Sequence, residues 1–279
     1  MTVKIVTDST SDLTPEVASE LGITVVPLYV NFDNAVYRDG VDMTTSAFYR
    51  RLAENHSLPT TAAPAPGAFA EVYNKLAKET DEIVVITISS RLSATYKAAA
   101  EGKEITNCKA QIEVLDSFAA IGGLGLIAIA AAKVANAGGN IDDVVDKVLS
   151  AMDRVEIRMA FDTLEYLKKG GRIGTATAFF GSVLKINPIL GLKDGLTEGI
   201  ARVRCRAKAI DYLFNYASSF PAIEELAIED ATTPEETEQL VQRLGTIYPA
   251  EKIYHLKVSP VIGTHVGPHV LGIGVLPKA

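Results

Sequence analysis

The chain lacks the features that mark several large classes of protein. Its 279 residues include two cysteines and no tryptophan, and 27 Lys and Arg stand against 34 Asp and Glu. Two cysteines far apart in sequence cannot build a disulfide scaffold, so we expect reduced, buried thiols. A net charge of −7 with scattered basic residues argues against a nucleic-acid partner, because phosphate binding requires clustered Lys and Arg.

Long apolar runs are also scarce. The longest, residues 121–132, is too short to span a bilayer. The first residues alternate like a buried strand and do not resemble a signal peptide. We therefore expect a cytoplasmic protein with no integral membrane association. What is present is an ordinary globular composition, 48% hydrophobic and 22% charged, over a length that suits two domains.

Short β-branched runs alternate with helical periods through the first half of the chain. Strands are expected at residues 3–7, 23–30, 82–88 and 111–115, and helices at 15–21, 45–54, 92–104 and 124–136. This alternation predicts a parallel sheet with helices on both faces. Ligands of such sheets bind at the carboxyl ends of strands, so the loops after Thr7, Ile88 and Leu115 are candidate site elements.

A second α/β segment follows a charged helix expected at residues 141–154. Its strands are expected near residues 158–162, 226–229, 252–256 and 272–276, and its helices near 175–184 and 207–220. We place the boundary near residue 156. The prediction is thus an N-terminal α/β domain, residues 1–156, and a C-terminal α/β domain, residues 157–279, with a pocket between them.

Several catalytic and cofactor motifs are absent or weak. Neither a phosphate-binding Gly-x-x-x-x-Gly-Lys-Ser/Thr loop nor a Gly-x-Ser-x-Gly elbow occurs. Gly123 and Gly125, followed by Ala128, match a loosened dinucleotide fingerprint, but packing of a helix through small residues explains them better.

Two histidines, His265 and His269, have the spacing of metal ligands on a helix. Gly263, Gly267 and Pro268 make a helix improbable there, so no metal is predicted. We expect no catalytic residues and no cofactor.

Hydroxyl-rich segments offer a better candidate for a site. They lie at residues 8–12, 59–61 and 89–95. Such residues usually cap helices, but Ser93 and Thr95 fall inside the start of an expected helix, beside the small Ala94. Helix N-termini favour anions, and an imidazole at His265 could donate to a carboxylate.

Five segments together resemble the DegV family, in order and spacing, across essentially the whole chain. They are Thr-Asp-Ser-Thr-Ser-Asp-Leu at 7–13, Pro-Thr-Thr at 59–61, Leu-Ser-Ala-Thr-Tyr at 92–96, Asp-Thr-Leu-Glu-Tyr-Leu-Lys-Lys-Gly-Gly-Arg-Ile-Gly at 162–174 and Gly-Thr-His-Val-Gly-Pro at 263–268. The resemblance implies a two-domain α/β protein that buries a long-chain fatty acid. It also implies a carrier without catalysis of its own, which presents the acyl carboxylate to a separate fatty-acid kinase for phospholipid synthesis.

The resemblance also implies which residues bind the carboxylate. Thr61 and Ser93 would donate hydrogen bonds to it, with His265 and Arg172 close by. The chain departs from the family at three places. Ala62-Ala63 stands where Ser-Gln is common, and Ala94 and His269 each stand where Gly is common.

Two other functions stay open from the residues alone. One is an enzyme that acts on an acyl or phosphorylated substrate through Ser93 or His265, although no nucleophile–base–orienter set is recognisable. The other is a sensor of a different small ligand, for which Ala62-Ala63 is the hint. Acyl chain length, unsaturation, the kinase and the oligomeric state do not follow from the sequence.

Overall fold

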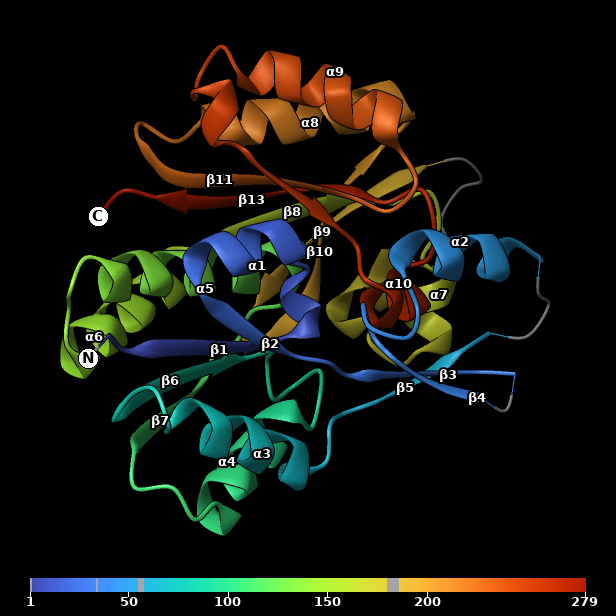
Figure 1. Cartoon of the computed structure of the whole chain (residues 1–279). Coiled ribbons are helices and arrows are strands. Elements are labelled where there is room, and N and C mark those ends of the chain that lie inside the picture. The colour runs from blue at the N-terminus through green and yellow to red at the C-terminus, as the bar shows by residue number, and fades with distance from the viewer. Residues whose placement is uncertain (1, 34, 55–57, 180–185) are drawn as a thin grey trace.

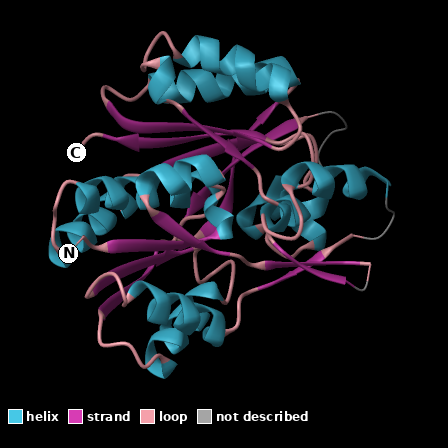
Figure 2. Ribbon diagram, viewed as in Figure 1, coloured by secondary structure: helices cyan, strands magenta, loops and turns pink. Residues whose placement is uncertain are grey.

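The fold is a stack of alternating helical and sheet layers. We describe it from a computed structural model, which covers residues 2–33, 35–54, 58–179 and 186–279. In Figure 1, α8 and α9 cover one face of a mixed sheet, and α1, α5 and α6 lie between that sheet and a parallel sheet. Helices α3 and α4 cover the parallel sheet's other face. Figure 2 shows the same layering by element type and confirms the predicted α/β class.

The parallel sheet has the strand order β2-β1-β6-β7. Its strands are β1 (Lys4–Asp8), β2 (Ile23–Val26), β6 (Glu82–Thr87) and β7 (Gln111–Asp116). From its second residue on, β6 is completely buried, as expected of an apolar run between helical layers. Because all four strands run the same way, β1, β6 and β7 end at one edge of the sheet.

The single strand predicted at residues 23–30 is wrong. The chain forms β2 and then β3 (Tyr29–Phe32), which belong to different sheets. Pro27 lies between them, and a proline has no N–H to donate to a ladder. Strand β3 pairs in antiparallel fashion with two strands that the sequence did not reveal, β4 (Ala35–Arg38) and β5 (Thr60–Ala62).

The mixed sheet has the order β10-β9-β8-β13-β11-β12, and all its strands come from residues 156–277. They are β8 (Glu156–Ala160), β9 (Asn187–Lys193), β10 (Leu196–Val203), β11 (Ile223–Asp230), β12 (Tyr254–Lys257) and β13 (Leu271–Pro277). Only β11 and β12 pair in parallel among these described strands. The hairpin of β9 and β10 was not predicted.

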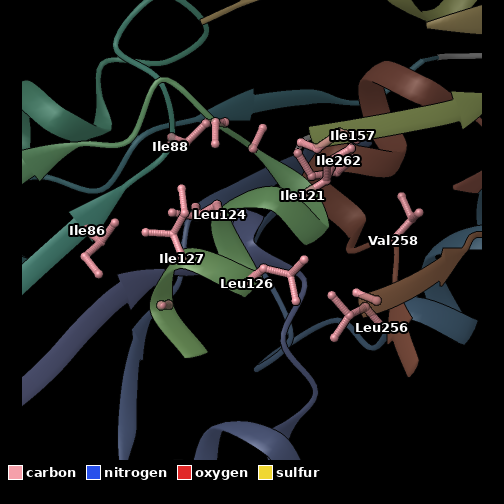
Figure 3. Packing of buried hydrophobic residues seen from close by; sticks show 14 of the residues in the cluster. Ile86, Ile88, Ile121, Leu124, Leu126, Ile127, Ile157, Leu256, Val258 and Ile262 are labelled. Carbon is pink, nitrogen blue, oxygen red and sulfur yellow. The ribbon is translucent and has the colours of Figure 1, made fainter. Parts of the chain in front are cut away.

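Helix α5 (Ile121–Asn136) lies at the centre and contacts both sheets. Its apolar side chains form the core, and Figure 3 shows Leu124, Leu126 and Ile127 packed among residues of neighbouring elements. A Cβ at Gly125 would lie 2.7 Å from the Ser11 carbonyl oxygen, and one at Gly123 would lie 2.3 Å from Ile157. The small residues of this segment therefore serve close packing.

The other helices are shorter and mostly amphipathic. They are α1 (Pro15–Leu21), α2 (Thr45–Glu54), α3 (Pro66–Leu76), α4 (Thr95–Ile105), α6 (Ile141–Met152), α7 (Glu165–Lys169), α8 (Arg206–Ser218), α9 (Pro234–Leu244) and α10 (Pro260–Val266). Three-residue 3-10 turns lie at Ser9–Ser11 and Ala250–Lys252. The helix predicted at 175–184 is a 3-10 helix over Gly174–Phe179 in its described part, and residues 180–185 lie outside the described residues.

The expectation that no helix forms around His265 is wrong. Helix α10 includes Gly263, which lets the helix pack directly on α2: a Cβ there would lie 2.6 Å from the Tyr49 hydroxyl. Tertiary packing here outweighs the low helix propensity of glycine.

No helix in the described part of the chain is both long and apolar enough to cross a bilayer. Cys108 and Cys205 are free thiols, as expected, but the prediction that they are buried is wrong, because Cys108 is partly buried and Cys205 is exposed.

Candidate functional site

A cavity of about 220 Å³ lies where the two sheets meet. One side is formed by the loops at the carboxyl ends of β1, β6 and β7, which contribute Thr10, Ile88 and Ala120. The mixed sheet and α10 close the other side. For comparison, an engineered apolar cavity of ~150 Å³ stays dry and binds benzene.

The buried carboxylate of Asp8 joins two of these loops. Its oxygens accept hydrogen bonds from the Ile88 N–H at 2.8 Å and from the Thr10 N–H at 3.0 Å. Burial raises the pKa of Asp8, and these hydrogen bonds act against that shift. The loops after β1 and β6, both predicted as site elements, are thereby held side by side.

The four predicted site residues, Thr61, Ser93, Arg172 and His265, all line this one cavity. Thr61 Oγ1 and His265 Nε2 are hydrogen-bonded at 2.9 Å, although 204 positions separate them in sequence. Two of the four come from the first half of the chain and two from the second. The cavity is thus completed only when the two halves pack together.

Strand β5 determines which way Thr61 points. Its neighbour Thr60 faces the opposite side, where its hydroxyl accepts a hydrogen bond from the Asn31 side-chain amide at 3.2 Å. Since successive side chains of a strand alternate, Thr61 points to the cavity and to His265. The partner strand fixes this register, because Thr61 pairs with Val30 of β3.

Ser93 lies just before α4, which begins at Thr95 and not at residue 92 as predicted. Its hydroxyl is 2.8 Å from the Thr95 hydroxyl and accepts a hydrogen bond from the Thr95 N–H at 3.3 Å. The N-cap residue, Ala94, has no side-chain acceptor for the other N–H groups of the first turn. Those groups make this end of α4 electrostatically positive toward the cavity.

Arg172 follows α7 and is exposed. Its Nε donates to the Leu92 carbonyl at 3.2 Å, and its Nη1 donates to the Gly170 carbonyl at 2.8 Å. These hydrogen bonds tie the glycine-rich turn of the second half to the Ser93 loop of the first half.

His265 is a neutral imidazole at ordinary pH. Burial, and then the neighbouring Arg172 charge, lower its pKa from 6.5 to about 4. Its Nδ1 is buried and meets no hydrogen-bond partner among the described residues. The ring lies directly against Gly170, where an added Cβ would come within 2.3 Å of Nδ1.

The rest of the cavity is mostly apolar. Ile157, Met159 and Phe161 alternate along and just beyond β8, so they face it together. Figure 3 shows Ile157 and Ile262 next to Ile121. Sequence reasoning identified few of these wall residues, although the period-two pattern around β8 was a usable signal. Further apolar wall residues are Leu28, Leu167, Leu190, Leu192, Val261 and Val266.

Ala62, Ala63 and Ala94, where the chain departs from the DegV pattern, also line the cavity. His269 is not among the lining residues; it lies beyond α10 at φ 59°, and its N–H donates to the Thr232 hydroxyl. The described residues contain no group of three or more His, Cys, Asp or Glu suited to a metal ion.

Comparisons with known proteins extend over the whole chain. Residues 2–278 match the family model described as "Uncharacterised protein, DegV family". A DegV domain-containing protein of Clostridium perfringens is 35% identical over 281 residues, covering 98% of both chains. One of Caldanaerobacter subterraneus is 34% identical over 275 residues, covering 97% of both.

Two solved structures superpose on the complete fold, each with 100% of both chains covered. A DegV family protein from Thermus thermophilus, described by its fatty acid binding, has a TM-score of 0.90 at 32% identity. DegV of Bacillus subtilis, described as a fatty acid binding protein, has a TM-score of 0.89 at 29% identity.

Proposed function

The chain belongs to the DegV family, and we propose that it binds a long-chain fatty acid in the cavity between its sheets and presents the carboxylate to a separate fatty-acid kinase. The observation that carries the proposal is the cavity's division into two chemically different parts. Thr61, Ser93, His265 and Arg172 gather at one part, as their mutual contacts show. The other lining residues are mostly aliphatic or aromatic.

The apolar walls support binding of an acyl tail. Burial contributes about 0.8 kcal/mol per methylene, so about fifteen methylenes contribute roughly 12 kcal/mol before the entropy of binding is subtracted. The tail therefore provides most of the affinity. The polar groups hold the carboxylate of the ligand at the polar end of the cavity.

The polar end supports recognition of a carboxylate. We assign the imidazole proton to Nε2, because an unpaired buried acceptor at Nδ1 is less costly than an unpaired N–H. The Thr61 hydroxyl then accepts from His265 and keeps its own proton for the ligand. The Ser93 hydroxyl and the first turn of α4 add further donors.

The same geometry favours binding over nucleophilic catalysis. A hydroxyl activated by histidine requires a third group that orients the imidazole through its other nitrogen. His265 Nδ1 meets no such group among the described residues, and Gly170 occupies the space beside it.

Mass spectrometry of the denatured protein, purified from a lipid-containing host, tests the ligand. We expect a stoichiometric fatty acid with the native sequence. Leu192→Trp, which fills the cavity wall, should abolish it, whereas Leu149→Trp on the exposed face of α6 should retain it. If the native protein carries no fatty acid and takes none up when it is added, the proposal is wrong.

The carrier role is tested by adding ATP and a candidate fatty-acid kinase to the loaded protein and trapping acyl phosphate with hydroxylamine. We expect acyl hydroxamate only when kinase and loaded carrier are both present. Equal product from free fatty acid without the carrier would contradict the presentation role.

A further inference from the structure

Buried carboxyl groups lie at the beginning of α10, the helix that has His265 in its last turn. The Ser259 N–H, at the N-cap, donates to Asp12 Oδ1 at 3.2 Å. The buried Asp39 carboxyl lies near the Val261 N–H of the first turn and the hydroxyls of Ser9 and Ser259, although neither of its oxygens accepts a hydrogen bond from the described residues. Both aspartates belong to the first half of the chain, and α10 belongs to the second.

Asp12 faces a second buried carboxyl group, Glu229 of β11. The two residues are 4% and 2% exposed. One oxygen of each is satisfied by a backbone N–H, since Glu229 Oε2 accepts from Gly122 at 2.9 Å and Asp12 Oδ1 accepts from Ser259. The remaining oxygens, Asp12 Oδ2 and Glu229 Oε1, are buried and meet no N–H or O–H donor of the described residues.

A single proton between these two oxygens satisfies both of them. With that proton, one carboxyl donates to the other; without it, two negative charges face each other away from water. Burial raises the pKa of both groups, and the neighbouring Glu229 charge raises that of Asp12 further.

The nearby charges act in the same direction. Asp39 and Asp230 add negative charge around the pair, and the Tyr49 hydroxyl is buried beside them. Lys257 of β12 is paired with Asp230.

The pair connects four parts of the fold at one point. Asp12 follows β1 of the parallel sheet, and Glu229 belongs to the mixed sheet. Gly122 lies in the first turn of the central helix α5, and Ser259 is the N-cap of α10. Helix α10 has seven residues, so a displacement at its first turn is transmitted directly to its last.

We infer that Asp12 and Glu229 share one proton and, together with Asp39, act as positioning residues that hold α10 so that His265 meets Thr61. The inference deepens the proposed function, because it assigns the residues that place the histidine at the ligand's polar end. Its test uses lipid-free protein, so absence of fatty-acid binding would overturn the proposed function and leave this test intact.

NMR of the His265 ring measures the effect directly. Asp12 lies in the left-handed region at φ 54°, which Asn and Gly tolerate, so substitutions there do not strain the backbone. Asp12→Asn provides a permanent donor to Glu229 and should leave the His265 ring shifts at neutral pH unchanged. Asp12→Gly removes the link and should raise the His265 pKa from about 4 toward 6.5 as the ring gains access to water.

Val148→Ala, in the buried face of α6, is the matched control for lost stability. We expect it to lower the melting temperature without changing the His265 titration. If Asp12→Gly leaves that titration unchanged, or if Val148→Ala changes it equally, the positioning role is wrong.

A second measurement does not depend on how well Asp12→Gly folds. His265 is fully neutral above pH 7, so a change of its ring signals at alkaline pH arises from the titration of another group. The native protein should show such a change as Asp39, whose pKa is about 7, and the Asp12–Glu229 pair, whose pKa burial raises, lose their protons. The double variant Asp12→Asn/Asp39→Asn should lose it; an unchanged alkaline response in that variant would overturn the shared proton.

Discussion

The two ends of α10 lie in opposite chemical surroundings. At its beginning, Asp12 and Asp39 are almost completely buried, and among their oxygens only Asp12 Oδ1 accepts a hydrogen bond from the described residues. At its end, His265 is half-buried against a cavity, and its Nδ1 lacks a partner among the described residues. Unpartnered carboxyl groups enclosed by protein favour the protonated form, whereas unpartnered groups at a cavity are available to a ligand.

The largest expected effect on stability comes from displacing α10 from α2. Gly263→Val places a branched side chain against Tyr49 and Phe48, where even a Cβ would lie within 2.7 Å of each. We expect the free energy of unfolding in urea to fall by more than about 3 kcal/mol, because overpacking moves α10 off α2.

Gly67→Val is the control for this substitution. Gly67 also lies in a helix, α3, but a Cβ there would meet nothing within 4 Å. A loss as large as that of Gly263→Val would show that helix propensity, and not the α10 contact, determines the result.

The two ends should respond to pH in opposite directions. The His265 pKa falls from 6.5 to about 4 on folding, so the unfolded state binds more protons in that window and stability rises with pH. The Asp39 pKa rises from 3.8 to about 7, so the folded state binds more protons and stability falls as pH rises through that window.

Chemical unfolding from pH 4 to 7.5 separates the two contributions. His265→Asn should remove the rising one and Asp39→Asn the falling one, each changing the slope by at most about 1.4 kcal/mol per pH unit. If both variants change the slope in the same direction, the opposition between the two ends is wrong.

A smaller effect is expected at Gly170, which lies against the His265 ring. Gly170 has φ/ψ of a right-handed helix, so Gly170→Ala fits the backbone, but its methyl group would meet His265 Nδ1. Because the ring can rotate away, we expect a loss of stability below about 1 kcal/mol. The His265 pKa, measured by NMR, should rise from about 4 as the ring moves toward the cavity.

Gly245→Ala, at the equivalent position after α9, should leave the His265 titration as it is. An unchanged titration in Gly170→Ala as well would show that Gly170 does not fix the ring.

The sequence predicted the elements whose pattern is local and strong. Helix α2 was expected at residues 45–54 and occupies them, and the parallel sheet followed from its buried strands. Strands β5 and β9 escaped prediction because short antiparallel strands depend on their partners more than on their own period. Helix α10 escaped because Gly263 argues against a helix until Tyr49 is known to pack on it.

The same division applies to the site. The Ser93 loop followed from the rule that ligands bind at strand ends, whereas Thr61 and Arg172 were suggested only by the family resemblance. The Asp12–Glu229 contact joins segments from opposite halves of the chain, and no local sequence pattern predicts it.

The smallest expected effect on folding comes from removing the hydroxyl of Thr61 or Ser93. These variants distinguish orientation of the ligand from its retention. Thr61→Ala and Ser93→Ala each remove hydrogen bonds, to His265 and to Thr95, and leave the buried carboxyl groups intact, so the free energy of unfolding should fall by no more than about 1 kcal/mol. Each loses about 1 kcal/mol of hydrogen bonding to the carboxylate, so fatty-acid affinity should fall roughly fivefold. Acyl-phosphate formation should fall more, because an acid that is retained by its tail but misoriented is a poor substrate for the kinase. Titration calorimetry and the hydroxamate assay compare the two losses. Equal losses in both measurements would mean that the hydroxyls contribute to retention of the fatty acid as much as to its orientation. The polar end of the cavity would then not be specialised in orienting the carboxylate.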